Sequence, residues 1–374
     1  MRKRWLLGLL ALGLVGSAVL AIQKSTIQKS TIQKSTIQKS TIQKSTVQAH
    51  LQADDTFVAE HAVVRIPLSG PLADRKAEIS GLAWWGDRLI LLPQYPERMG
   101  GQIFAIDKAE IVNWLERENG GAALLAEAIA FDDGEIGEMI EGYEGYEAIA
   151  FQMPAQTPAQ APAQAPSAFL AIESETGDGT LGYIVTATMH EDGSRLIVDP
   201  SSRVEVRPQS TSPNKSEESL LLTDAQIISL YEVNGESLNP DPVAHSFTLS
   251  LAETASIPFP QIDYRITDAT ALDQQNRFWA INYFYPGDSD LAVDQDPLSA
   301  RYGEGETHQQ QAAVERLVEF VYAPDGIVMA DRPPIQLMLE EDARNWEGIV
   351  RLGDRGFLLV TDKFPDTILG FVEK

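Results

Sequence analysis

Three acidic residues recur at equivalent places in similar segments of the 374-residue chain. Each segment starts with a small or acidic residue, continues with alternating apolar residues, and reaches a second apolar run through a turn. Four such segments occur: SGLAWWGDRLILLPQ from Ser80, EAIAFQ from Glu147 (resuming as SAFLAIESE), DATALDQQNRFWAINY from Asp268 and EGIVRLGDRGFLLVTD from Glu347. Their acidic first residues are candidates for one shared site.

Carboxylates that converge repel one another, and a hard cation such as Ca²⁺ relieves that repulsion. The predicted metal ligands are therefore Glu147, Asp268 and Glu347, and a bound ion there would polarise an ester oxygen and activate water. The alternative is that each carboxylate only accepts hydrogen bonds from backbone N–H groups at the start of its own strand. The rest of the candidate site comprises Glu173, Asn282 and Asp362, with Trp84, Arg265, Trp279, Tyr283 and Trp346 as candidates for substrate contact.

A second acidic cluster lies in the stretch PGDSDLAVDQDP, where Asp288, Asp290 and Asp294 share one loop. Oxygen ligands on such a turn could hold Ca²⁺, although the glycine and the final glutamate of the EF-hand loop are missing. The alternative is an acidic loop in contact with solvent.

Familiar catalytic and cofactor motifs are absent from the chain. It has no cysteine, no G-x-S-x-G elbow, no P-loop and no G-x-G-x-x-G fingerprint, and its five histidines are scattered. These absences leave the catalytic residues unknown and give no nucleotide, haem or flavin signal.

The elements that must position the acidic residues are short antiparallel strands. A β-hairpin pattern that recurs four times with loose spacing is typical of a β-propeller, and the alternative is a β-sandwich or two β domains. The gap between the segments from Glu147 and Asp268 has room for an unmarked blade, and RLVEFVYAPDG indicates a further one. We therefore expect an all-β propeller of about six blades, with five or seven as alternatives.

Two biased stretches are expected as inserts of the propeller, at 154–167 and 200–219. The first, rich in Pro and Ala, falls at a hairpin tip, where a long insertion costs little loop-closure entropy. The two ends of the propeller, HAVVRIPLS and TILGFVEK, are expected to share a blade and close the ring.

The chain resembles the phytase-like propeller family described as "esterase-like activity of phytase". The resemblance rests on EISGLAW, GYEAIAF with FLAIESE, YRITDATALDQQNRFWAINYFYPGD and NWEGIVRLGDRGFLLVTD, and covers most of residues 62–374. It implies an extracytoplasmic propeller that hydrolyses a phosphate or carboxylic ester. The basic residues that phytate would need are only scattered, as Arg265, Arg344 and Lys363, so phytate itself is a poor candidate.

The N-terminal region has the pattern of an export signal. Residues 1–21 combine a basic start with an apolar run, which predicts a signal peptide, or an uncleaved membrane anchor over residues 5–22. The IQKST repeats make residues 22–56 a low-complexity linker, and residues 57–374 form the propeller domain. We expect a periplasmic or extracellular monomer.

The charge balance narrows the choice of partner. The formal net charge is −25, and without the basic residues 1–46 it is −33. Such a surface repels nucleic acid and anionic lipid, so contact with a membrane is expected only through the N-terminal segment. Two functions remain: a Ca²⁺-dependent hydrolase of a small-molecule ester, or a non-catalytic propeller that binds an envelope protein, peptide or glycan.

Overall fold

The computed structural model describes residues 58–117, 120–152, 167–177 and 179–374. The predicted signal peptide, the linker and nearly all of the first insert lie outside these residues. All described residues belong to the unit Asp55–Lys374. No helix among them is long and apolar enough to cross a membrane.

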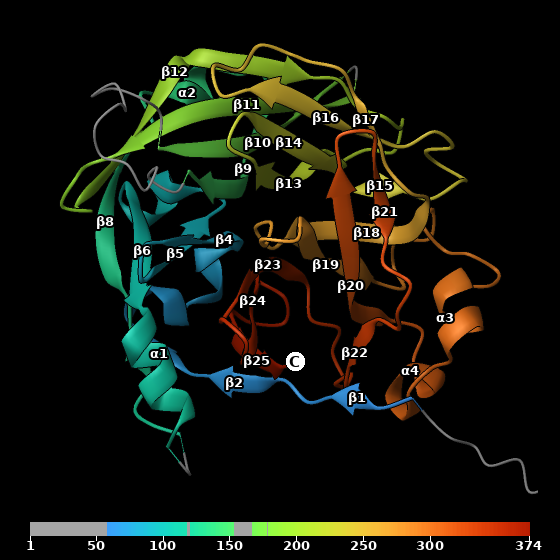
Figure 1. The fold of residues 1–374 in the computed structure, drawn as a ribbon. Coiled ribbons are helices and arrows are strands. Elements are labelled where there is room, and N and C mark those ends of the chain that lie inside the picture. Colours follow the sequence, from blue (N-terminus) through green and yellow to red (C-terminus); the bar gives the residue numbers. More distant parts are fainter. Residues whose placement is uncertain (1–57, 118–119, 153–166, 178) are drawn as a thin grey trace, which may run out of the picture. The chain divides into compact units, whose positions relative to one another are not determined.

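The described residues fold into a β-propeller of five blades (Figure 1). The inner strands form a closed ring, because β4 contacts β9, β9 contacts β13, β13 contacts β18, β18 contacts β23 and β23 returns to β4. The blades, from the inner strand outward, are β4 (Ile79–Trp85), β5 (Arg88–Pro93), β6 (Gln102–Asp107) and β8 (Glu127–Asp132); β9 (Tyr143–Phe151), β10 (Ala168–Thr176), β11 (Gly179–Met189) and β12 (Arg195–Val206); β13 (Glu217–Leu222), β14 (Gln226–Tyr231), β16 (Val243–Thr248) and β17 (Ile257–Pro258); β18 (Ile262–Ala269), β19 (Arg277–Phe284), β20 (Val314–Ala323) and β22 (Ile335–Leu337); and β23 (Trp346–Arg351), β24 (Gly356–Thr361), β25 (Leu369–Glu373) and β2 (Val64–Ile66).

The remaining elements are short and lie at blade edges or in connections. They are the strands β1 (Glu60–His61), β3 (Leu68–Ser69), β7 (Leu124–Leu125), β15 (Val233–Asn234) and β21 (Gly326–Met329), the helices α1 (Lys108–Leu115), α2 (Ile136–Met139), α3 (Pro297–Tyr302) and α4 (Glu306–Gln310), and the 3-10 turns η1 (Gly70–Ala73), η2 (Arg75–Ala77) and η3 (Pro96–Met99).

The predicted propeller is confirmed, and its blade number is five, the lower of the two alternatives to the expected six. The expected unmarked blade exists as β13, β14, β16 and β17. The stretch RLVEFVYAPDG, expected to start a further blade, instead supplies β20, because it pairs with β19 of the fourth blade. A long apolar run fits a third strand as well as a first, so the pattern alone could not separate these cases.

The second expected insert, 200–219, is wrong over half of its length. Residues 200–206 belong to β12, an outer strand whose alternation of exposed and buried residues matches a blade edge. Glu217–Leu222 forms β13, the inner strand of the third blade. Only the loop between these strands, 207–216, is irregular, and it lies close to the channel, as shown below.

The fold is held by one apolar cluster between each pair of neighbouring blades. For example, Ile349 and Phe357 of the fifth blade pack with Trp279 of the fourth, and Leu82 of the first packs with Val360 of the fifth. The ring closes where β2 pairs with β25, as the sequence predicted, with Val64 opposite Phe371. Every inner strand is therefore buried on both faces and can carry side chains to the central axis.

Candidate functional site: a carboxylate cluster in the propeller channel

Each inner strand contains an extra residue relative to its partner at a corresponding place, which makes a β-bulge, and β9 has a second register shift nearer its start. A bulge disrupts the ladder locally and re-aims the side chain of the extra residue. The extra residues are Ser80, Glu147, Glu218, one of the pair Thr267–Asp268, and Glu347. The repeat predicted from the sequence thus corresponds to a repeated backbone feature, and Glu218 is its member in the unmarked blade.

Five buried glutamates from three blades lie near the propeller axis, where the charges of some of them raise the pKa values of their neighbours. The set is Glu147 on β9, Glu173 on β10, Glu218 on β13, Glu232 directly after β14, and Glu347 on β23. None is more than 7% exposed. We call this set the channel cluster.

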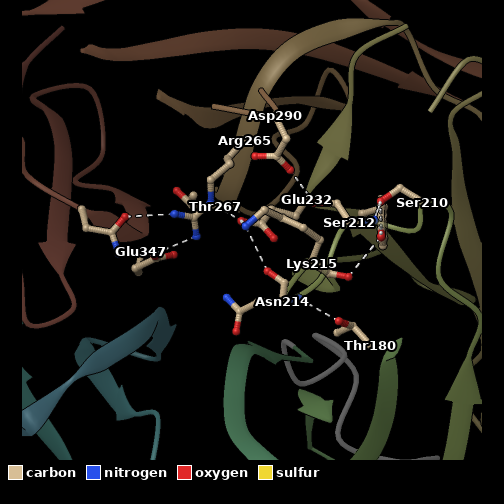
Figure 2. Close-up of polar contacts among 12 residues, drawn as sticks. Thr180, Ser210, Ser212, Asn214, Lys215, Glu232, Arg265, Thr267, Asp290 and Glu347 are labelled. Atoms are coloured by element: carbon tan, nitrogen blue, oxygen red, sulfur yellow. Dashed lines mark hydrogen bonds and ion pairs between the residues drawn. The ribbon is translucent and has the colours of Figure 1, made fainter. Parts of the chain in front are cut away.

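Arg265 of β18 is the first of two cations that contact the channel cluster (Figure 2). Its guanidinium pairs with Glu232, donates from Nη2 to Glu347 Oε1 at 3.1 Å, and donates from Nη1 to Asn345 Oδ1 at 3.2 Å. Asn345 in turn donates to Glu347 Oε1 at 2.6 Å. The guanidinium therefore links the third, fourth and fifth blades across the channel.

Lys215 is the second cation, and the irregular loop 207–216 brings it there. Its Nζ lies 3.9 Å from Glu232 and donates to the carbonyl of Asn214 at 3.0 Å. The loop is anchored on both sides, since the N–H of Asn214 donates to Thr180 at 2.8 Å and the Ser212 hydroxyl donates to Asp290 at 2.6 Å (Figure 2). Two cations thus face five carboxyl groups.

Burial and mutual repulsion make several of these carboxyl groups hold protons more tightly. Burial, opposed by the charge of Arg265, raises the pKa of Glu347 to about 8. Burial and the charge of Glu232 raise the pKa of Glu173 to about 7. Burial and neighbouring glutamates also raise the pKa values of Glu147 and Glu218 well above their usual range. The cluster therefore contains protonated carboxyl groups at neutral pH.

One carboxyl oxygen of the cluster, Oε2 of Glu232, is completely buried and has no hydrogen-bond partner among the described residues. Glu232 is fully buried, and its Oε1 pairs with Arg265 and Lys215, yet its Oε2 accepts no hydrogen bond. An unpaired buried carboxylate oxygen is costly, so such groups are rare outside sites that hold water or a ligand.

Asp268, a predicted metal ligand, instead joins two blades. Its Oδ2 accepts a hydrogen bond from the N–H of Ile349 at 2.7 Å. The neighbouring Thr267 donates a hydrogen bond to the carbonyl of Trp346 in the fifth blade. In the same way, the hydroxyl of Ser80 in the first blade donates to the carbonyl of Tyr146 in the second. Asp268 therefore follows the alternative in which a carboxylate only accepts hydrogen bonds from backbone N–H groups. The N–H group in question belongs to a neighbouring blade, however, and not to the strand of Asp268.

The other predicted residues lie in the structural core, at the channel mouth or, for Trp84, at the opposite end of the channel. Trp279 and Trp346 are 0% exposed and pack between the fourth and fifth blades, which places them out of reach of a substrate. Asn282 is also buried, and it holds the carbonyls of Asp263 and Arg265 and the side chain of Arg316. The remaining candidates, Trp84, Tyr283, Arg265 and Asp362, lie at cavities or beside the cluster.

A cavity of about 480 Å³ opens at the mouth where the inner strands begin. Arg265 and Asn345 belong to its wall, and both donate to Glu347. Three aromatic rings, those of Tyr283, Tyr285 and Phe364, line it together with Asp288, Asp342, Ala343 and Pro365, and Arg75 lies 4.8 Å above the ring of Phe364. A ligand in this cavity would lie next to the channel cluster.

The residues present do not fit the expected calcium ion. Glu347 is bonded to Arg265 and Asn345, Glu147 accepts from Gln94 Nε2 at 2.8 Å, and Asp268 is taken by backbone. Across the described part of the chain, no group of three or more His, Cys, Asp or Glu side chains is placed to hold a metal ion. This includes Asp288, Asp290 and Asp294 of the second acidic loop.

The sequence reasoning missed Glu218, Glu232 and Lys215. Glu218 and Lys215 lie in the stretch expected as an insert, and Glu232 follows the apolar run IISLY in the gap where only an unmarked blade was expected. A signal existed in the second case, because an acidic residue at the end of an apolar run matches the positions of Glu173 and Asp362 in their blades.

Fold and site define a five-bladed propeller with a carboxylate-lined channel. No family model and no curated protein sequence matches the chain. Among solved structures it is similar to a glucose dehydrogenase, with 13% identity, 84% of this chain and 99% of that chain covered, and a TM-score of 0.41. It is also similar to the catalytic domain of the Coprinopsis cinerea GH62 alpha-L-arabinofuranosidase, with 10% identity, 84% and 96% covered, and a TM-score of 0.43. Neither likeness identifies a reaction for this chain.

Proposed function

We propose that the protein is an exported hydrolase of the phytase-like propeller group, which cleaves a carboxylic ester at the channel mouth by general acid–base catalysis. The observation that carries this proposal is the unpartnered Oε2 of Glu232 within a cluster of carboxyl groups of raised pKa. Strongly perturbed carboxyl groups beside a cavity are characteristic of functional sites.

The roles follow from the contacts of Glu232 and from the raised pKa of Glu347. Glu232, paired with two cations, is the base: its free Oε2 takes a proton from water, whose oxygen attacks the ester carbonyl carbon. Glu347, with a pKa of about 8, is the acid, since it keeps a proton at neutral pH to give to the leaving alkoxide. Its Oε1 already accepts from Arg265 and Asn345, so the proton belongs on Oε2.

The charge of the cluster favours a carboxylic ester over a phosphate ester. Two cations face five carboxyl groups, and the positive charge of Arg265 is already shared between Glu232 and Glu347. A doubly charged phosphate would find no cation there that is free to pair with it, because Glu232 already contacts both Arg265 and Lys215, whereas a neutral ester needs no such partner. The aromatic wall of the mouth suits an ester with an apolar portion.

The second candidate is a non-catalytic propeller that captures an envelope protein, peptide or glycan. It is supported by the structural duties of the bulge residues, such as the contacts of Glu147 with Gln94 and of Asp268 with Ile349. A repeated position can reflect a repeated structural role alone.

The test is hydrolysis of p-nitrophenyl butyrate and p-nitrophenyl phosphate by the wild type and by E232Q, E347Q and the control E191Q, whose residue is exposed. We expect butyrate hydrolysis that each cluster variant lowers by roughly 10²-fold or more, with the control unchanged. Activity abolished by EDTA and restored by Ca²⁺ would instead support the calcium-dependent version. A folded protein that hydrolyses neither ester favours the binding propeller.

A further inference from the structure

The lining of the channel changes from polar to apolar along the propeller axis. Two residues beyond the bulge in four of the inner strands, the side chain is apolar: Leu82, Ile149, Leu220 and Ile349. These residues are between 0 and 6% exposed, so they close the channel below the carboxyl groups. The ends of the inner strands therefore enclose a space that is separate from the candidate active site.

That space is a cavity of about 350 Å³ lined by residues of all five inner strands and the turns that follow them. Its wall is mostly apolar and includes Phe151 and Leu222, with Trp84 at its rim; Thr270, Asp273 and Arg351 are its polar members. Because every blade contributes, the opening is enclosed on all sides, which admits a slender group and excludes a folded partner.

The polar side chains at this cavity form hydrogen bonds with the protein backbone. The indole N–H of Trp84 donates to the carbonyl of Arg351 at 2.8 Å, and the hydroxyl oxygen of Thr270 accepts from the N–H of Trp279 at 3.0 Å. The guanidinium of Arg351 donates to the carbonyls of Ala271 and Arg277 and lies 3.8 Å from Asp273. Most side-chain donors and acceptors of the wall are therefore engaged within the protein, and the charges of Arg351 and Asp273 offset each other at the rim.

We propose that this cavity binds the alkyl chain of a free, uncharged amphiphile, with the chain inside and the polar head at the rim. Burying such a chain releases water from the apolar wall, which is the main source of affinity at a site with few free hydrogen-bonding groups. A charged head would gain nothing from the neutral Arg351–Asp273 pair. The proposal is independent of the chemistry at the opposite mouth.

The probe is N-phenyl-1-naphthylamine, an uncharged dye that fluoresces in apolar surroundings, titrated into the full chain. We expect saturable binding of one dye per chain, displaced by monomeric 1-decanol and accompanied by a change in tryptophan emission from Trp84. Substituting the exposed rim residue, A271W, should raise the dye Kd about tenfold or more by filling the space, whereas A122W, in an exposed loop of the first blade, should not.

A second variant, A150F, fills the cavity from another blade and should give the same loss if A271W folds poorly. Binding that is not saturable, or that both filling variants leave unchanged, would overturn the proposal. So would association with phosphatidylcholine vesicles without displacement of the dye by 1-decanol, because the ligand would then be a membrane surface.

Discussion

Replacing Glu347 with glutamine should make the protein less sensitive to alkaline pH. The pKa of this carboxyl group rises from 4.5 in the unfolded chain to about 8 in the folded protein. Between these values the folded state binds the proton more tightly than the unfolded state does. The free energy of unfolding therefore falls as pH rises through this window, and is lowest above pH 8.

The magnitude follows from the width of the window. Each pH unit between the two pKa values costs about 1.4 kcal/mol. From pH 6 to pH 9 the wild type should therefore lose about 3 kcal/mol through Glu347 alone. Glutamine cannot ionise but can still accept hydrogen bonds from Arg265 and Asn345, so E347Q should escape this loss.

The assay is urea unfolding followed by tryptophan fluorescence at pH 6 and at pH 9, for the wild type, E347Q and E191Q. The difference between E347Q and the wild type should shift by about 3 kcal/mol in favour of the variant on going from pH 6 to pH 9. Any constant cost of the substitution cancels in this comparison. A difference that stays the same at both pH values would refute the assignment of Glu347 as the carboxyl group that holds a proton.

Three further predictions concern single contacts. R265M should lower the free energy of unfolding by about 3–5 kcal/mol at pH 7 in urea, because it leaves Glu232 buried without its main cation. D268A should lower the free energy of unfolding by about 1–3 kcal/mol in the same assay, because the N–H of Ile349 loses its acceptor. A change below about 0.5 kcal/mol would contradict the role of Asp268 in joining two blades. Burial favours the neutral form of His245, but the hydrogen bond with Glu217 outweighs it and raises the pKa. The stability that this pair contributes is full below pH 6.5 and is lost as pH rises through the folded pKa, so H245Q should destabilise at pH 5.5 more than at pH 8.5.

The propeller and its repeat could be predicted because hairpins leave a local pattern. Ser80, Glu147 and Glu347 do occupy one bulge position, as the aligned segments indicated, and Asp268 belongs to the pair of residues at that position in β18. The blade number could not be predicted with the same precision, because an apolar run such as the one in β20 reads alike in any strand of a blade.

The chemistry of the site could not be predicted, because it depends on contacts between segments that are far apart in the chain. The spacing of residues within one segment does not indicate such contacts. Asp268 and Glu347 look equivalent in the sequence, yet one binds a backbone N–H of the next blade and the other an arginine 82 residues away. Trp279 and Trp346 could not be told from channel residues, because a tryptophan on an inner or second strand suits a core and a ligand site equally well. Lys215 enters the channel only through the path of an irregular loop.

The pairing of β2 with β25 has a consequence for how the molecule reaches its folded state. The first four blades each come from one continuous stretch of chain, but Val64 must find Phe371 at the far end. Closing a loop of that length costs about 3 kcal/mol more conformational entropy than closing a ten-residue hairpin. We therefore expect ring closure to be the late step of folding, and until it occurs β25 is an open edge on which a second unfinished molecule could add a strand.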